Sequence, residues 1–448
     1  MLPVNAANSK PMSWLFSYCL DFGVCFNYPK EYWFGYFDAL RQHGYNGACL
    51  YVSGTMPMPG YEPTLQWRCD YVGEMVDYLH KIGMRAYLHL GLFGWMGMSP
   101  GLIRMHPEIE ITWPEKLKEA YSLESMRRGI CPTRGKQVCL DYVMALFEAC
   151  PQADGLCLEI FCEKPHCECA DCQAKGLWRV ELDFLKSLSA RLWKMSPKAE
   201  IIWALGYERT HGKPPESNLY DEIAKLDDPR YIWWLTRPKQ GYLDASGARR
   251  EWMDPAVLAR LGRRVLTFIP PPGEEKDAKT IFRTARAASA LGAIVHEPNV
   301  RYMFLPELAP SHFGFTVQVP PPERPQYEHV LFHLRALRRQ MEFKDPDLAE
   351  EKFAAAAAKE FFADCGNRKH EFARYLLFWE KLIIEERLCM ARSQDRLWND
   401  LDGNESLKIN AKIGEHRALV AEIAALPPGN RWLEDLRRGA AALMAGIQ

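Results

Sequence analysis

Residues 14–52, WLFSYCLDFGVCFNYPKEYWFGYFDALRQHGYNGACLYV, decide the fold because they contain one complete strand–helix–strand unit. The apolar runs 14–20 and 47–52 have the length and composition of strands, and residues 30–43 between them repeat apolar side chains at helical spacing. Short strands that read as continuous apolar runs are typical of parallel strands with helices on one side and a packed core on the other. The stretch therefore predicts an α/β domain with a parallel sheet.

The same alternation continues to about residue 300. Strands are expected at 14–20, 47–52, 85–90, 155–161, 200–205, 231–235, 264–269 and 293–295, and helices at 30–43, 69–82, 137–149, 177–195, 219–226, 255–261 and 278–291. Eight strands alternating with seven helices predict a (β/α)8 TIM barrel, and the next helical pattern, at 327–341, is a candidate for its eighth helix. A doubly wound open sheet is the competing interpretation, but residues 20–25, LDFGVC, supply no glycine-rich phosphate loop after the first strand.

The alternation of strand and helix patterns ends at the proline-rich residues 320–325, PPPERP. Helical patterns follow at 327–341, 348–365, 368–395, 410–425 and 432–445, with few β-branched runs. We therefore expect a catalytic barrel over residues 1–320 and an all-helical C-terminal domain over residues 321–448. That domain is expected either to cap the barrel or to join two subunits into a homodimer.

Composition excludes several classes of partner. The chain has 448 residues, 48% of them hydrophobic and 25% charged, and a net charge of −1, so no overall field attracts nucleic acid or an acidic membrane. No apolar run approaches the ~18 residues of a membrane span. The N-terminal residues lack the pattern of a signal peptide, and the 14 cysteines are scattered, so we expect reduced thiols and a cytoplasmic protein.

A barrel of this kind places its active site at the C-terminal ends of its strands and in the loops that follow. Aromatic, carboxylate and amide side chains dominate these positions, which favours a carbohydrate as the ligand because aromatic faces stack on sugar rings and polar groups bind hydroxyls. By alternation, only one of Trp233 and Trp234 can face the substrate. The candidate substrate-binding residues are Asp21, Tyr51, His89, Trp95, Trp203, Tyr207, Trp234, Arg237, His296, Glu297 and Asn299.

The fourth expected strand ends in two acidic residues, Glu159 and Glu163. They would be ~13 Å apart on an extended strand, too far for an acid–nucleophile pair. Glu163 is nearer the rim and is the better general acid. Glu159 lies deeper, where it either acts on the substrate or is a buried carboxylate tied to a neighbouring arginine or histidine.

Three segments resemble the catalytic barrel of glycoside hydrolase family 20, the β-N-acetylhexosaminidases: residues 18–51, residues 103–108 (IRMHPE) and residues 155–163 (GLCLEIFCE). The resemblance implies a substrate-assisted retaining hydrolase that removes a terminal β-linked N-acetylhexosamine, GalNAc or GlcNAc, without a cofactor. In that family an Asp–Glu pair ends the fourth strand. The Glu is the acid/base, and the Asp orients the acetamido group whose carbonyl attacks the anomeric carbon.

Carried onto this chain, the resemblance makes Glu163 the acid/base and leaves Cys162 where the family has aspartate. A thiol is a weak hydrogen-bonding partner, so the acetamido-orienting role needs another group. Glu159 or Asp21 is a candidate to orient the acetamido group in place of the missing aspartate. A different sugar and mechanism, or a non-catalytic sugar-binding barrel, are the alternatives.

Soft metal ligands crowd the segment after this strand: Cys162, His166, Cys167, Cys169 and Cys172. Four such ligands complete a tetrahedral zinc site, and a distant thiol such as Cys131 could supply one of them. The alternatives are reduced loop cysteines or a local disulfide. A closed site would be structural, whereas an open position would make the protein a zinc-dependent hydrolase. The soft ligands favour the structural site.

Overall fold

The structure of the chain is a computed structural model. It describes residues 13–19, 30–42, 44–52, 62–93, 102–103, 105–112, 129–160, 167–205, 219–235, 241–243, 249–251, 261, 264–269, 291–296, 354–355, 358–359, 362–375, 417–429, 433–434 and 437. The chain divides into two compact units. One contains the barrel strands, and the other contains the described residues from 354 onward.

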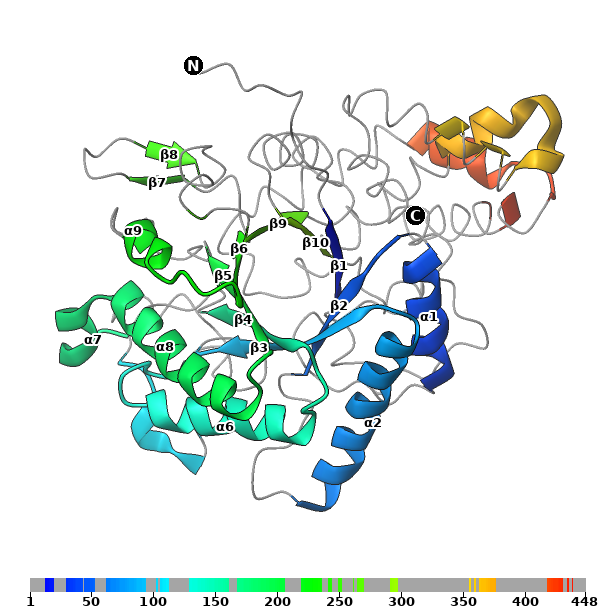
Figure 1. Cartoon of the computed structure of the whole chain (residues 1–448). Coiled ribbons are helices and arrows are strands. Elements are labelled where there is room, and N and C mark those ends of the chain that lie inside the picture. The colour runs from blue at the N-terminus through cyan, green and yellow to red at the C-terminus, as the bar shows by residue number, and fades with distance from the viewer. Residues whose placement is uncertain are drawn as a thin grey trace. The chain divides into compact units, whose positions relative to one another are not determined.

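Eight parallel strands form a closed barrel in the order β1-β10-β9-β6-β5-β4-β3-β2 (Figure 1). All eight lie where the sequence predicts them, within two residues at either end, so the predicted barrel is confirmed. The strands are β1 (Trp14–Cys19), β2 (Gly47–Tyr51), β3 (Arg85–Leu92), β4 (Gly155–Ile160), β5 (Glu200–Leu205), β6 (Tyr231–Leu235), β9 (Val265–Ile269) and β10 (Gly292–His296).

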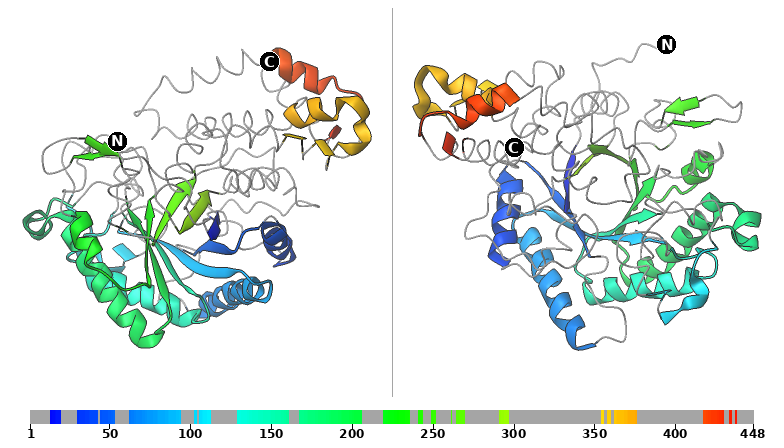
Figure 2. Two further views of the ribbon diagram at one scale, coloured as in Figure 1. Left: turned by 45° about the horizontal axis from the view of Figure 1, so that its top comes forward. Right: turned by 180° about the vertical axis from the view of Figure 1, so that it is seen from behind.

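Helices lie outside this ring of strands, as the views from other sides also show (Figure 2). Their bounds are α1 (Lys30–Gln42), α2 (Glu62–Lys81), α6 (Lys136–Ala149), α8 (Leu177–Met195) and α9 (Leu219–Ala224). Each lies in the interval between two strands where the sequence predicts a helix. The predicted helices at 255–261 and 278–291 lie outside the described residues, apart from the buried Leu261 and from Leu291, which precedes β10.

The barrel interior is a packed core, because alternate residues of each strand point inward. Every barrel strand contributes to one buried cluster, which consists of Phe16, Cys49, Tyr87, Cys157, Ile202, Ala204, Ile232, Trp234, Leu266 and Ile294. The residues between them face the helices: the Ser17 hydroxyl, for example, lies 3.3 Å from the Tyr36 hydroxyl of α1. Alternation thus sorts each strand into an inner and an outer face.

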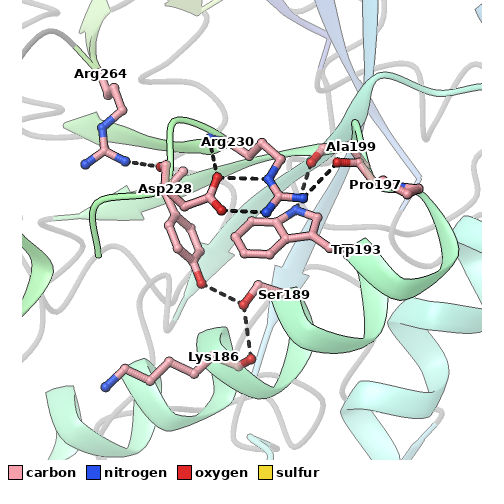
Figure 3. Close-up of polar contacts among 9 residues, drawn as sticks. Lys186, Ser189, Trp193, Pro197, Ala199, Asp228, Arg230 and Arg264 are labelled. Carbon is pink, nitrogen blue, oxygen red and sulfur yellow. Dashed lines mark hydrogen bonds and ion pairs between the residues drawn. The ribbon is translucent and has the colours of Figure 1, made fainter. Parts of the chain in front are cut away.

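A polar network at the start of β6 joins this strand to α8 (Figure 3). The guanidinium of Arg230 donates to Asp228 at 2.8 Å and lies 3.7 Å above the ring of Trp193. Deeper in the same contact, the hydroxyls of Ser189 and Tyr231 are 2.6 Å apart and both side chains are buried. Interactions at this end of a barrel stabilise the fold and leave the opposite end for chemistry.

Several short elements were not predicted from the sequence. They are the antiparallel pair β7 (Gly241–Leu243) and β8 (Arg249–Glu251), the helix α7 (Ala170–Lys175), and the 3-10 turns η3 (Pro107–Ile109) and η4 (Ala363–Arg368). Each of the five has six residues or fewer, a length at which apolar periodicity carries little signal. The fifth, η4, replaces the end of the helix predicted at 348–365.

The described part of the second unit is mainly helical, with helices at 369–375 and 417–424. Phe362, Phe372 and Ile423 are among its buried apolar side chains. The domain boundary at residue 320 and the homodimer stay predictions. Within the described residues, no helix combines the length and the apolar character needed to cross a bilayer.

Candidate functional site

Four inward side chains form a layer toward the C-terminal ends of the strands, and one of them, Trp234, also belongs to the apolar core. Tyr51 is the last residue of β2, and Glu159 and Trp234 are the penultimate residues of β4 and β6. His89 of β3 pairs in register with Tyr51. All four side chains are buried, at the end of the barrel where such folds carry their chemistry.

His89 and Glu159 form a buried pair at the centre of this layer. His89 Nε2 lies 3.4 Å from Glu159 Oε2, with exposed fractions of 0% and 2% for the two side chains. Register explains the approach: Glu159 pairs with Gly91, which has no side chain, so the carboxylate can lean diagonally toward His89. Of the two roles that the sequence leaves open for Glu159, the tie to a neighbouring histidine is the geometry observed.

Aromatic rings hold the imidazole of His89 on two sides. The ring of Tyr51 lies 5.2 Å from it between centroids, and the ring of Trp234 lies 6.2 Å from it in an edge-on arrangement. Trp234 belongs to the inner cluster, whereas Trp233 stacks on Tyr231 at 5.7 Å on the helix side. Alternation therefore selects Trp234 as the inward tryptophan of β6, as the sequence requires of one of the two.

Trp203 needs a correction as a candidate sugar contact. Its strand neighbours Ile202 and Ala204 belong to the inner cluster, so Trp203 points the other way. Its ring lies 6.4 Å from that of Phe184 in α8, and it is 1% exposed. Trp203 packs the strand against the helix layer instead of lining the mouth of the barrel.

Most of the other candidates belong to parts of the chain outside the described residues. His296 ends β10, but its side chain is not among those described. The candidates that lie outside the described residues are Asp21, Trp95, Cys162, Glu163, His166, Tyr207, Arg237, Glu297 and Asn299. Their roles stay predictions.

A second constellation consists of four cysteine side chains: Cys131, Cys167, Cys169 and Cys172. Their sulfur atoms all lie within 4.8 Å of one another. Cys131 Sγ is 3.7 Å from Cys169 Sγ and 3.6 Å from Cys172 Sγ. Cys169 is partly exposed and the other three are buried. The fourth thiol thus comes from Cys131, 36 residues before Cys167.

Two segments position these thiols. Cys131 follows a short bridge between Glu110 and Ile130 and precedes α6, where its carbonyl accepts a hydrogen bond from Gly135 N–H at 2.7 Å. Cys167 and Cys169 precede α7, and Cys172 lies in its first turn. These are the connections that follow β3 and β4, the strands of His89 and Glu159.

Donors surround the sulfur atoms. The backbone N–H of Thr112 donates to Cys167 Sγ at 3.2 Å, and that of Arg134 donates to Cys131 Sγ at 3.5 Å. Hydrogen bonds from the thiols of Cys167 and Cys172 lower the pKa of Cys131 below its usual range. The hydroxyl of Thr133 lies 3.1 Å from Cys131 Sγ. Nothing in the sequence pattern singles out Thr133 except its place two residues after Cys131.

Comparison with known proteins supports the fold. No family model matches the chain, and no curated protein matches it. Among solved structures, a GH138 enzyme targeting pectin rhamnogalacturonan II is similar at 10% identity with a TM-score of 0.55, over 97% of this chain. The chain spans 57% of the length of that enzyme. At this identity the similarity shows the barrel fold alone.

Two further structures superpose less well. A β-N-acetylhexosaminidase has 12% identity and a TM-score of 0.43, over 78% of this chain and 76% of its own. An O-GlcNAc hydrolase from Thermobaculum terrenum has 9% identity and a TM-score of 0.38, over 98% of this chain and 95% of its own.

Proposed function

We propose that this chain is a glycoside hydrolase whose substrate binds at the C-terminal end of the barrel. The observation that carries the proposal is the layer of Tyr51, His89, Glu159 and Trp234, which places two aromatic rings around a buried His–Glu pair 3.4 Å apart. Aromatic surface beside a few oriented polar groups suits a sugar ring and its hydroxyls. The GH138 enzyme, which has a similar barrel, targets pectin rhamnogalacturonan II, a carbohydrate like the substrate proposed here.

The substrate that we propose is a terminal β-linked N-acetylhexosamine, GalNAc or GlcNAc. This step rests on the resemblance of residues 155–163 to the fourth strand of family 20 barrels. Glu163 gives its proton to the glycosidic oxygen while the acetamido carbonyl oxygen attacks the anomeric carbon and the bond to the leaving group breaks. Glu163 then takes a proton from the water that opens the cyclic intermediate, so the sugar leaves with its configuration retained.

We assign Glu159 a positioning role rather than the acid/base role. At 2% exposure its carboxylate faces His89, and together with Tyr51 and Trp234 it holds the imidazole in one orientation. A fixed imidazole is a good partner for a sugar hydroxyl, because Nδ1, the nitrogen on the other side of the ring from Nε2 and Glu159, can also take part in hydrogen bonds. Glu163 is the catalytic residue and His89 is the substrate contact.

A panel of nitrophenyl glycosides tests the activity. We expect hydrolysis of β-linked N-acetylhexosaminides, and a loss of about 10²- to 10⁴-fold in kcat/KM for Glu163→Gln. Glu168→Gln is the matched control, since Glu168 is an exposed acid five residues further along the chain. Hydrolysis that survives Glu163→Gln in a folded protein would rule out the assigned acid.

One alternative is favoured by a specific observation. Cys162 stands where the resembling family has aspartate, so the barrel could bind sugars without cleaving them. Calorimetry with N-acetylglucosamine and N-acetylgalactosamine separates the two functions. Binding with no turnover of any glycoside would establish the sugar-binding barrel and refute the hydrolase.

A further inference from the structure

We propose that Cys131, Cys167, Cys169 and Cys172 bind one zinc ion in a closed, structural site. Tetrahedral zinc–thiolate bonds of about 2.3 Å place the ligand sulfurs about 3.8 Å apart. The measured separations from Cys131 Sγ are 3.6 and 3.7 Å, and no pair in the set exceeds 4.8 Å. The four sulfurs are therefore spaced to surround one ion.

The distances between the sulfur atoms also distinguish a zinc site from a disulfide and from an iron–sulfur cluster. Sulfur atoms 3.6 Å apart are not bonded, so a disulfide between Cys131 and Cys172 is not the state described. An iron–sulfur cluster interposes several irons and inorganic sulfides, and needs thiolates spread more widely than this set. Four soft thiolates around a single tetrahedral position are the ligands of structural zinc.

The surroundings suit a negatively charged metal–thiolate group. Backbone N–H groups of Thr112 and Arg134 point at two of the sulfurs, and the Thr133 hydroxyl lies within 3.8 Å of three of them. Such outer partners orient thiolates and offset their charge. Ile111 packs against the buried cysteines and limits the access of water.

A set of four thiolates leaves no coordination position for a water molecule. A zinc-dependent hydrolase needs such an open position, so this site does not supply hydrolytic chemistry. Its effect is mechanical: it joins the connection after β3, which contains Cys131, to the connection after β4, which contains Cys167. Glu163, the proposed acid, lies four residues before Cys167.

The zinc ion therefore anchors the chain four residues after the proposed acid, an extension that rests on the proposed function. Loss of zinc should lower glycosidase activity without removing any catalytic group. The metal site itself stands on the thiol geometry alone, so it is tested separately from activity.

Metal content of the full chain, purified under reducing conditions without chelators, is the first measurement. Elemental analysis by mass spectrometry should find about one zinc ion per chain. Cys131→Ser should reduce zinc at least ten-fold, whereas the control Cys365→Ser should retain it, because Cys365 belongs to the other compact unit. Cobalt exchanged into the site should show the strong visible absorption of thiolate ligation.

A second measurement covers the case in which Cys131→Ser does not fold. Alkylation of the wild-type chain is mapped by mass spectrometry before and after chelation. The four site cysteines should be protected until zinc is removed, while Cys365 reacts in both states. Folded protein that neither contains nor takes up zinc or cobalt would overturn the proposal, as would equal alkylation of Cys169 and Cys365 in the zinc-loaded chain.

The two proposals fail in distinguishable ways. Zinc-loaded protein with no activity on any glycoside refutes the hydrolase and leaves the metal site standing. Folded, active protein that neither contains nor takes up zinc or cobalt refutes the metal site and leaves the hydrolase standing. Activity that is unchanged after zinc is removed and the chain remains folded refutes only the link between them.

Discussion

Replacement of Glu159 by alanine should lower the free energy of unfolding of the barrel by about 3 kcal/mol. The carboxylate is 2% exposed and lies 3.4 Å from His89 Nε2. Its removal leaves one side of a fully buried imidazole facing a cavity, at a cost of about 2 kcal/mol within the usual range of about 1–3. The buried methylene that is lost adds about 0.8 kcal/mol.

Glu159→Gln is the contrasting variant. The amide keeps the volume of the side chain and an oxygen that can accept from His89, so the cost should be no more than about 1 kcal/mol. Activity should nevertheless fall, because a neutral amide holds the imidazole less firmly than a carboxylate does. We expect about a 10-fold loss in kcat/KM for Glu159→Gln, well short of the loss for Glu163→Gln.

Urea unfolding measures the free energies of unfolding of the wild type and of these variants. Tryptophan fluorescence follows the barrel, where Trp203, Trp233 and Trp234 are buried, and circular dichroism checks that both probes report one transition. A double-mutant cycle with His89→Phe isolates the pair, and we expect a coupling energy of at least about 1 kcal/mol. Additive effects within about 0.5 kcal/mol, or Glu159→Ala as stable as the wild type, would refute the pairing.

Two further predictions concern the network at the start of the strands. Ser189→Ala should destabilise the fold by about 2 kcal/mol, because it leaves the buried Tyr231 hydroxyl without its partner at 2.6 Å. Tyr231→Phe should cost only about 1 kcal/mol, since Ser189 Oγ can still donate to the Lys186 carbonyl at 3.0 Å; equal losses in urea unfolding would contradict this order. Hydrogen bonds from Arg230 lower the pKa of Asp228, so this pair stabilises the fold above the unfolded pKa of about 3.9, and its contribution is lost as pH falls through the lower folded pKa. Asp228→Asn should therefore lower the free energy of unfolding by about 1 kcal/mol near neutral pH and make that free energy fall less steeply as pH is lowered. An unchanged dependence on acid pH would count against the Asp228–Arg230 pair.

Local sequence determines the eight barrel strands of this protein to within two residues. Each barrel strand is a short apolar run, and residues 30–42 and 177–195 have helical periodicity that depends only on neighbours three and four positions away. The β4 segment also indicates by itself that Glu159 is an inner-face residue, since the apolar Leu158 and Ile160 on either side of it suit the helix layer. The crowded thiols at 167–172 are equally visible, because they are adjacent in the chain.

Tertiary structure decides what depends on register and on distant partners. Alternation alone does not say which of two adjacent tryptophans faces inward; closure of the barrel sets that face and turns Trp203 toward α8. The pairing of β3 with β4 brings His89 to Glu159, 70 residues apart, through the gap left by Gly91. The same neighbouring connections bring Cys131 to Cys172 across 41 residues. No local pattern encodes such contacts, because they arise from packing between strands that only the folded barrel makes neighbours.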